Sequence, residues 1–111
     1  MHCGFCLDSC PSYVLWAQEA DSPRGRIVLI DDALRGDGKI SEEFVSHFDS
    51  CLGCMACVTA CPSGVRYDRL IERVRPQIER QHRRTGAERA LRLLLFETLP
   101  YPQRMRRLVP M

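Results

Sequence analysis

The feature that most constrains this chain is a cysteine spacing that occurs twice. Residues 51–62 read CLGCMACVTACP, in which cysteines at offsets 0, 3, 6 and 10 are followed by proline. Residues 3–11 read CGFCLDSCP, and when the two Cys-Pro pairs are aligned its cysteines fall on offsets 3, 6 and 10. Offset 0 of this first run would lie one residue before Met1. The chain therefore carries seven of the eight cysteines that two complete runs contain.

The spacing C-x2-C-x2-C-x3-C-P is typical of bacterial iron–sulfur proteins, and in two-cluster proteins its fourth cysteine binds the other cluster. The pattern therefore predicts two [4Fe–4S] clusters with exchanged fourth ligands. One predicted ligand set is Cys51, Cys54, Cys57 and Cys10, and the other is Cys3, Cys6 and Cys61. The three-cysteine set is one ligand short, so an incomplete, three-iron or absent cluster is the alternative there.

Zinc is the competing metal for so many cysteines. Structural zinc sites usually combine C-x2-C pairs across a longer loop, which the triple spacing fits poorly. Secreted disulfide scaffolds usually carry an even number of cysteines behind a signal peptide, and neither feature occurs in this sequence. No stretch approaches the roughly 18 apolar residues of a membrane span. These observations predict a cytoplasmic protein whose cysteines hold metal as thiolates.

Other candidate site residues are weaker. His2 lies between ligand positions, and His47 and His82 stand alone in helical segments, so a terminal or structural position is expected for each. Trp16 is expected in the core. No nucleophile–base pair and no glycine-rich phosphate loop is present, so no catalytic residue is predicted.

The apolar spacing is helical almost throughout and predicts an all-α fold. Ser22 and Ser41 are placed to cap helices, and Gly36 lies where a helix should end. We expect residues 1–80 to form a dicluster domain around the metal. Residues 81–111 are expected to form a helical arm that follows this domain.

Charge is distributed unevenly along the chain. The net charge is +2, but residues 1–65 sum to −5 and residues 66–111 to +7. A basic half can dock an acidic partner or an anionic membrane surface. Nucleic acid is not an expected partner, because no aromatic platform or known binding motif accompanies the arginines.

Four segments together resemble one family, the glycolate oxidase iron-sulfur subunits, whose relatives serve lactate utilisation, anaerobic glycerol-3-phosphate oxidation and heterodisulfide reduction. The segments are HCGFCLDSCPSY, SPRGRI, CLGCMACVTACPSGVRY and LLLFETLPYPQRMRRL, within residues 2–107. The resemblance implies an α-helical ferredoxin-like module with two [4Fe–4S] clusters. Its implied cluster ligands are Cys3, Cys6, Cys10, Cys51, Cys54, Cys57 and Cys61.

The resemblance implies that residues 81–111 are a helical linker to a cysteine-rich region absent from this sequence. The sequence departs from that family at both ends, where the first ligand and this long cysteine-rich part are missing. We therefore expect a fragment of a longer subunit, or a start codon assigned too late, with a short protein carrying one damaged cluster as the alternative. The SPRGR segment specifies the family more closely than the cysteines do. Our interpretation of it is modest: Pro23 in the first turn of a helix, and Arg24 and Arg26 on the surface.

The resemblance implies an electron relay and not a catalytic chain. Electrons would come from a flavin-bearing dehydrogenase subunit that oxidises glycolate or another 2-hydroxy acid, and would leave toward quinone or another acceptor. The location would be cytoplasmic, with peripheral contact at the inner face of the membrane. The alternatives are a standalone dicluster ferredoxin-like carrier, a small heterodisulfide-reductase-type subunit, or a zinc module for protein interaction.

Overall fold

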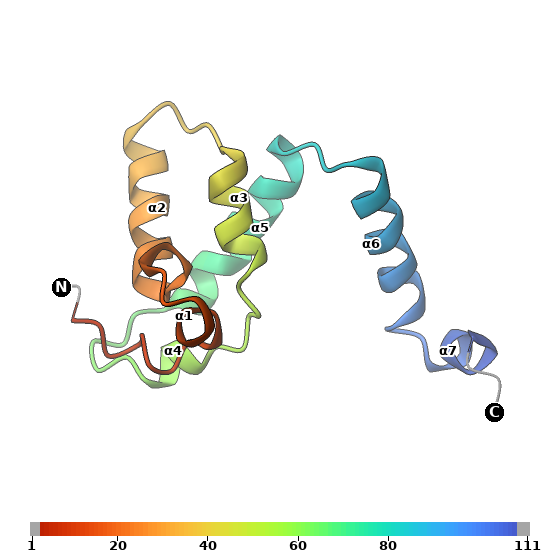
Figure 1. The fold of residues 1–111 in the computed structure, drawn as a ribbon, viewed down its shortest axis with the longest axis horizontal. Helices are drawn as coiled ribbons and strands as arrows, with labels where there is room; N and C mark the ends of the chain where they lie inside the picture. Colours follow the sequence, from red (N-terminus) through yellow and green to blue (C-terminus); the bar gives the residue numbers. More distant parts are fainter. Residues whose placement is uncertain (1–2, 109–111) are drawn as a thin grey trace.

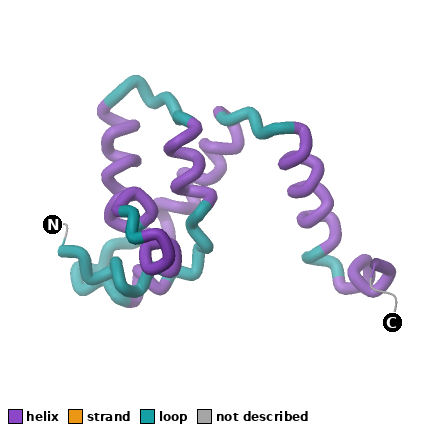
Figure 2. The backbone as a smooth tube through the Cα atoms, viewed as in Figure 1, coloured by secondary structure: helices purple, strands orange, loops and turns teal. Residues whose placement is uncertain are grey.

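The computed structural model describes residues 3–108, and these residues form helices and no strand (Figures 1 and 2). The all-α prediction is confirmed. In chain order the elements are α1 (Pro11–Trp16), the 3₁₀ helix η1 (Glu19–Asp21), α2 (Pro23–Arg35), α3 (Glu42–Asp49), α4 (Ala56–Thr59), α5 (Tyr67–Gln81), α6 (Gly86–Thr98) and α7 (Pro102–Leu108).

Helices α2 and α3 stand side by side, and α5 lies behind them (Figure 1). The short helices α1 and α4 lie below, together with the loops that carry the two cysteine runs. A loop after α5 leads to α6, which lies to one side of this group and reaches it through ion pairs of Arg92 with Asp49 and Glu79, and α7 follows beyond α6. The cysteine loops are thus collected at one end of a small helical body.

The core is small and centres on α3 and α5. Phe44 and Phe48 lie one turn apart on α3, are 8% and 1% exposed, and stack with ring centroids 4.5 Å apart. Ile71 and Ile78 cover them from α5, each 2% exposed. Full burial of a side chain of this size contributes roughly 1.5–3 kcal/mol. Cys57 belongs to the same buried cluster, so the core continues directly into the cysteine region.

Helix starts follow the sequence closely. The Ser22 hydroxyl accepts a hydrogen bond from the Gly25 amide at 2.8 Å, and the Ser41 hydroxyl accepts one from the Phe44 amide at 3.1 Å. Gly36 ends α2, its amide donating to the Asp32 carbonyl. Each of these positions matches its predicted role. The two serine hydroxyls satisfy free amides at helix N-termini, and glycine is common where a helix ends.

Trp16 is 56% exposed, so its predicted place in the core was wrong. Helix α1 has six residues and ends at Ala17, whose backbone is left-handed with φ 50°. The helix is too short to carry a continuous apolar face against α3 and α5. Its only buried residue is the polar Ser12.

Candidate metal centre

Two cavities collect the seven cysteines. The first cavity is lined by Cys3, Cys6 and Cys61, which form one predicted ligand set, and also by Cys57. The second cavity is lined by Cys10, Cys51, Cys54 and Cys57. The structure therefore brings together the same two groups of cysteines that the spacing predicts, including the exchange of Cys10 and Cys61. That these thiols bind the clusters remains a prediction.

The two loops share a backbone turn at equivalent positions. In each run the residue after the offset-3 cysteine has a positive φ, 85° at Gly4 and 61° at Met55. Left-handed backbone reverses the course of a loop without a long detour. The repeat is therefore a repeat of conformation as well as of cysteine spacing.

Helices then lead the chain out of each loop. Cys10 is the extended residue before α1, and Pro11 occupies the first helical position, where a missing amide hydrogen costs nothing. In the second run Cys57 lies within the four-residue α4, and Cys61 follows shortly after it. The last cysteine of each run is thereby separated from the earlier cysteines of that run and lines the other cavity.

Two thiols of the second cavity, those of Cys10 and Cys57, lie in a shielded environment, whereas Cys54 is exposed. Cys10 and Cys57 are 8% and 9% exposed. Burial first, and then the nearby Cys51 and Cys10, raise the pKa of Cys57 to about 11. Burial also acts to raise the pKa of Cys10, but hydrogen bonds from Ser12 and the backbone, with the Arg26 cation, hold it below its usual value. Thiolate at Cys10 is thus stabilised by protein groups.

The donors around both cavities suit an iron–sulfur cluster. The described residues that line them include no carboxylate, so thiol sulfur is the dominant metal donor. Soft thiolates select iron–sulfur clusters or zinc over magnesium or calcium. Within residues 3–108, no three His, Cys, Asp or Glu side chains converge on a position for a single metal ion. The thiols instead line the two cavities, and each cavity receives thiols from both cysteine loops.

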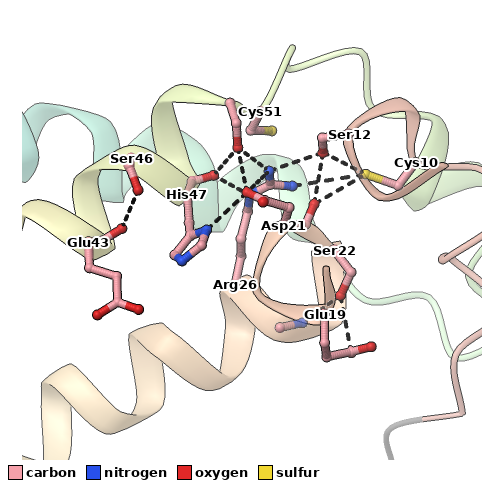
Figure 3. Close-up of polar contacts among 12 residues, drawn as sticks. Cys10, Ser12, Glu19, Asp21, Ser22, Arg26, Glu43, Ser46, His47 and Cys51 are labelled. Atoms are coloured by element: carbon pink, nitrogen blue, oxygen red, sulfur yellow. Dashed lines mark hydrogen bonds and ion pairs between the residues drawn. The ribbon is translucent and has the colours of Figure 1, made fainter. Parts of the chain in front are cut away.

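Beside the second cavity lies a buried polar network (Figure 3). Arg26 is 1% exposed, so its predicted place on the surface was wrong. Its Nε donates to the His47 carbonyl at 2.6 Å, and its Nη2 donates to the Ser12 and Ser50 hydroxyls at 3.1 and 2.8 Å. Asp21 lies 3.5 Å from Nη2 and balances the buried charge.

Neither His47 nor His82 lines a cysteine cavity. His47 is 6% exposed and its Nδ1 is 3.0 Å from Asp21 Oδ1, so it is a buried structural residue, as predicted. His82 is half-buried at the end of α5. His2 lies outside the described residues. The contacts of Asp21, Ser12 and Ser50 with the buried Arg26 were not predicted. The SPRGR segment, which contains Arg26, was the one sequence signal that could have indicated this network.

A small all-α domain with two adjacent cavities, each lined by cysteines, has the architecture of a dicluster iron–sulfur protein. The sequence model of the 4Fe-4S dicluster domain matches residues 1–65, and the chain belongs to this family. Two [4Fe–4S] clusters are therefore its cofactors, in agreement with the cysteine spacing.

Two curated proteins are similar over nearly the whole chain. The glycolate oxidase iron-sulfur subunit of Escherichia coli (strain K12) is 44% identical over 102 residues, which are 92% of this chain and 25% of that protein. The probable glycolate oxidase iron-sulfur subunit of Bacillus subtilis (strain 168) is 43% identical over 108 residues, 96% of this chain and 24% of that protein. The chain thus spans about a quarter of the length of these relatives.

No solved structure gives a significant match to the chain. Among the helices of residues 3–108, none combines the length and the apolar character needed to cross a membrane.

Proposed function

We propose that this chain is an electron-transfer module of a 2-hydroxy-acid oxidase of the glycolate oxidase type. Electrons enter from a flavin-bearing dehydrogenase subunit, pass between two clusters and leave toward quinone or another acceptor. The observation that carries the proposal is the adjacency of the two cavities, which share Pro23, Cys57 and Tyr67 in their walls. A relay needs neighbouring redox centres, and adjacent cavities provide places for them.

We propose the ligands in the same two groups. Cys10, Cys51, Cys54 and Cys57 hold the cluster of the second cavity. Cys3, Cys6 and Cys61 hold the cluster of the first cavity. When bound, the clusters supply one-electron transfer, and the protein fixes their positions and electronic surroundings. Tyr67 contributes to the electronic surroundings of the second cluster. Burial raises the pKa of its phenol, so the hydroxyl keeps its proton and donates a hydrogen bond to Cys51 Sγ at 3.8 Å.

The helical arm of residues 81–111 is proposed as the linker to the remaining part of a longer subunit. Figure 1 draws α6 and α7 apart from the cysteine-bearing body. Helix α6 presents strongly exposed apolar side chains, among them Leu93 at 65% and Phe96 at 66%. The basic residues after residue 65 provide a surface for an acidic partner subunit or an anionic membrane face.

Anaerobic reconstitution of the full chain, with iron and sulfide counted and EPR spectra recorded, tests the core of this proposal. We expect about eight iron per chain and two coupled signals after reduction. About four iron would restrict the proposal to the second cavity, and an oxidised three-iron signal would mark the first cavity as one ligand short. Zinc uptake without iron would contradict the proposal.

The donor is tested separately, by mixing the reconstituted chain anaerobically with the flavin-bearing subunit. Glycolate should then reduce the clusters, which is followed as bleaching of their visible absorption. Reduction by dithionite but not by glycolate with that subunit would reject the proposed donor and leave cluster binding intact.

A further inference from the structure

One short segment brings an arginine to each of the two cavities. Arg24 lines the first cavity beside Cys3 and Cys6, and Arg26 lines the second cavity beside Cys10. Both residues lie in the first turn of α2. Side chains two positions apart on an α-helix point about 200° away from each other around the axis. The helix start therefore lies between the cavities and directs one cation to each side.

The segment is held firmly in this position. A Cβ atom at Gly25 would lie 1.9 Å from the Glu19 carbonyl oxygen, so the backbone of α2 is packed directly on η1. Ser22 is fully buried and caps the helix through the Gly25 amide. The two arginines consequently start from a backbone that has little freedom to move.

Arg26 and Ser12 both reach the sulfur of Cys10 (Figure 3). Arg26 Nη1 lies 3.9 Å from Cys10 Sγ, and Ser12 Oγ lies 3.2 Å from it. A thiol at Cys10 can donate its own hydrogen to the Asp21 carbonyl, 3.7 Å away. A metal-bound thiolate has no hydrogen to donate, so it can only accept. The Tyr13 backbone amide and the Arg26 N–H can donate to it. The Ser12 O–H, which donates to the Asp21 carbonyl at 2.8 Å while Cys10 is a thiol, can turn to the thiolate as a third donor.

The two arginines differ in how strongly they can act. Arg26 is 1% exposed, whereas the Arg24 side chain is 29% exposed and pairs with Glu19 at 2.6 Å. Asp21 offsets part of the Arg26 charge, but the N–H groups still face the sulfur. A dipole or charge in a buried environment is screened much less than one near water.

We propose that Arg26, together with Ser12, sets the reduction potential of the cluster in the second cavity by donating to Cys10 Sγ, and that Arg24 acts more weakly at the first cavity. Adding one electron to a cluster places more negative charge on its sulfurs. Hydrogen bonds and a nearby cation stabilise that charge and raise the potential. This inference rests on the ligand groups of the proposed function.

Redox titration of the reconstituted full chain, followed by EPR, tests the inference. A Cys54→Ala variant removes a ligand from the second cavity alone and thereby identifies its signal. In Arg26→Gln we expect the ratio of reduced to oxidised cluster in the second cavity to fall about tenfold at a fixed potential, a shift of about 59 mV for one electron. The other cluster should move less. Arg24→Gln is the matched control, with a smaller shift and at the first cavity.

Further variants separate tuning from folding. Arg26→Lys keeps the charge and should recover part of the shift, and Ser12→Ala should lower the potential of the same cluster less than Arg26→Gln does. If Arg26→Gln fails to take up iron, Ser12→Ala carries the test. Unchanged potentials in variants that retain their iron would overturn the inference while the proposed function stands. Absence of iron in the unaltered chain would overturn both.

Discussion

The two cavities arise from the same cysteine spacing but offer different surroundings. In the second cavity Cys10 and Cys57 are buried and Cys54 is exposed, and hydroxyl, phenol and guanidinium donors lie near the sulfurs. In the first cavity Cys3 is exposed and Cys6 and Cys61 are half-buried. The Cys61 sulfur accepts a hydrogen bond from the Val65 backbone amide at 3.5 Å. The pKa of Cys6 in this cavity is raised, mainly by burial and to a smaller extent by the neighbouring thiols of Cys61 and Cys3.

The cysteine spacing determines which thiols meet, whereas other segments of the chain determine what surrounds them. The second cavity is lined by its own loop within residues 51–57, by residues 9–12, and by the buried Arg26 from the start of α2. The first is lined by Cys3, Gly4 and Cys6, the start of α2 and residues within 57–67. Because the buried Arg26 and Ser12 line only the second cavity, a cluster there should depend more on the protein around it.

Loss of one cysteine should separate the cavities most strongly. Cys57→Ala removes a predicted ligand that is also part of the hydrophobic core, and we expect at least about four iron per chain to be lost. Cys3→Ala is the matched control at an exposed position and should reduce only the occupancy of the first cavity. Iron analysis with circular dichroism measures both effects. Equal loss of helix content in the two variants would contradict the asymmetry.

Replacement of the buried Arg26 should have the next largest effect, a loss of folding stability. Arg26→Met leaves Asp21 buried with its cation lost, and breaking such a pair costs about 3–5 kcal/mol of the free energy of unfolding. Arg24→Met should change stability little, because that ion pair is exposed to solvent. Urea denaturation of the reconstituted proteins measures the difference. Adding Asp21→Asn to Arg26→Met should recover part of the loss, and a further loss would rule out the unpaired charge as its cause.

The cysteine pattern allowed the grouping of the thiols to be predicted, because ligand spacing is local and repeats. The caps at Ser22 and Ser41 were predictable for the same reason. The burial of Arg26 was not, since its partners Ser12, Asp21, His47 and Ser50 come from three other parts of the chain. Such a site needs the packing of α2 against η1 and α3, and no single segment encodes that packing.

The contact of α2 with η1 can be tested at Gly25. Gly25→Ala would place a methyl group against the Glu19 backbone, and overpacking of this kind costs about 1–3 kcal/mol. The matched control is Gly86→Ala at the start of α6, where nothing lies within 4 Å of the added atom and a gain of about 0.4–1 kcal/mol is expected. Denaturation midpoints compare the two. A neutral Gly25→Ala would show that α2 can shift away from η1 at little cost.

The smallest effect should distinguish the equivalent turns of the two loops. A left-handed conformation costs an ordinary residue about 1–2 kcal/mol, so Gly4→Ala, at φ 85°, should destabilise the first loop by about this amount. Met55 already carries that cost at φ 61°, but its side chain packs against the core.

Met55→Gly relieves the backbone strain but loses the side-chain packing, so it should change the free energy of unfolding by less than about 1 kcal/mol. Met55→Ala keeps the strained backbone and loses the packing, so it should be the more destabilising substitution. Urea denaturation of both variants decides between these contributions. Equal destabilisation would mean that the backbone conformation of the second loop carries no cost, and that the two turns, although alike in geometry, are maintained by different forces.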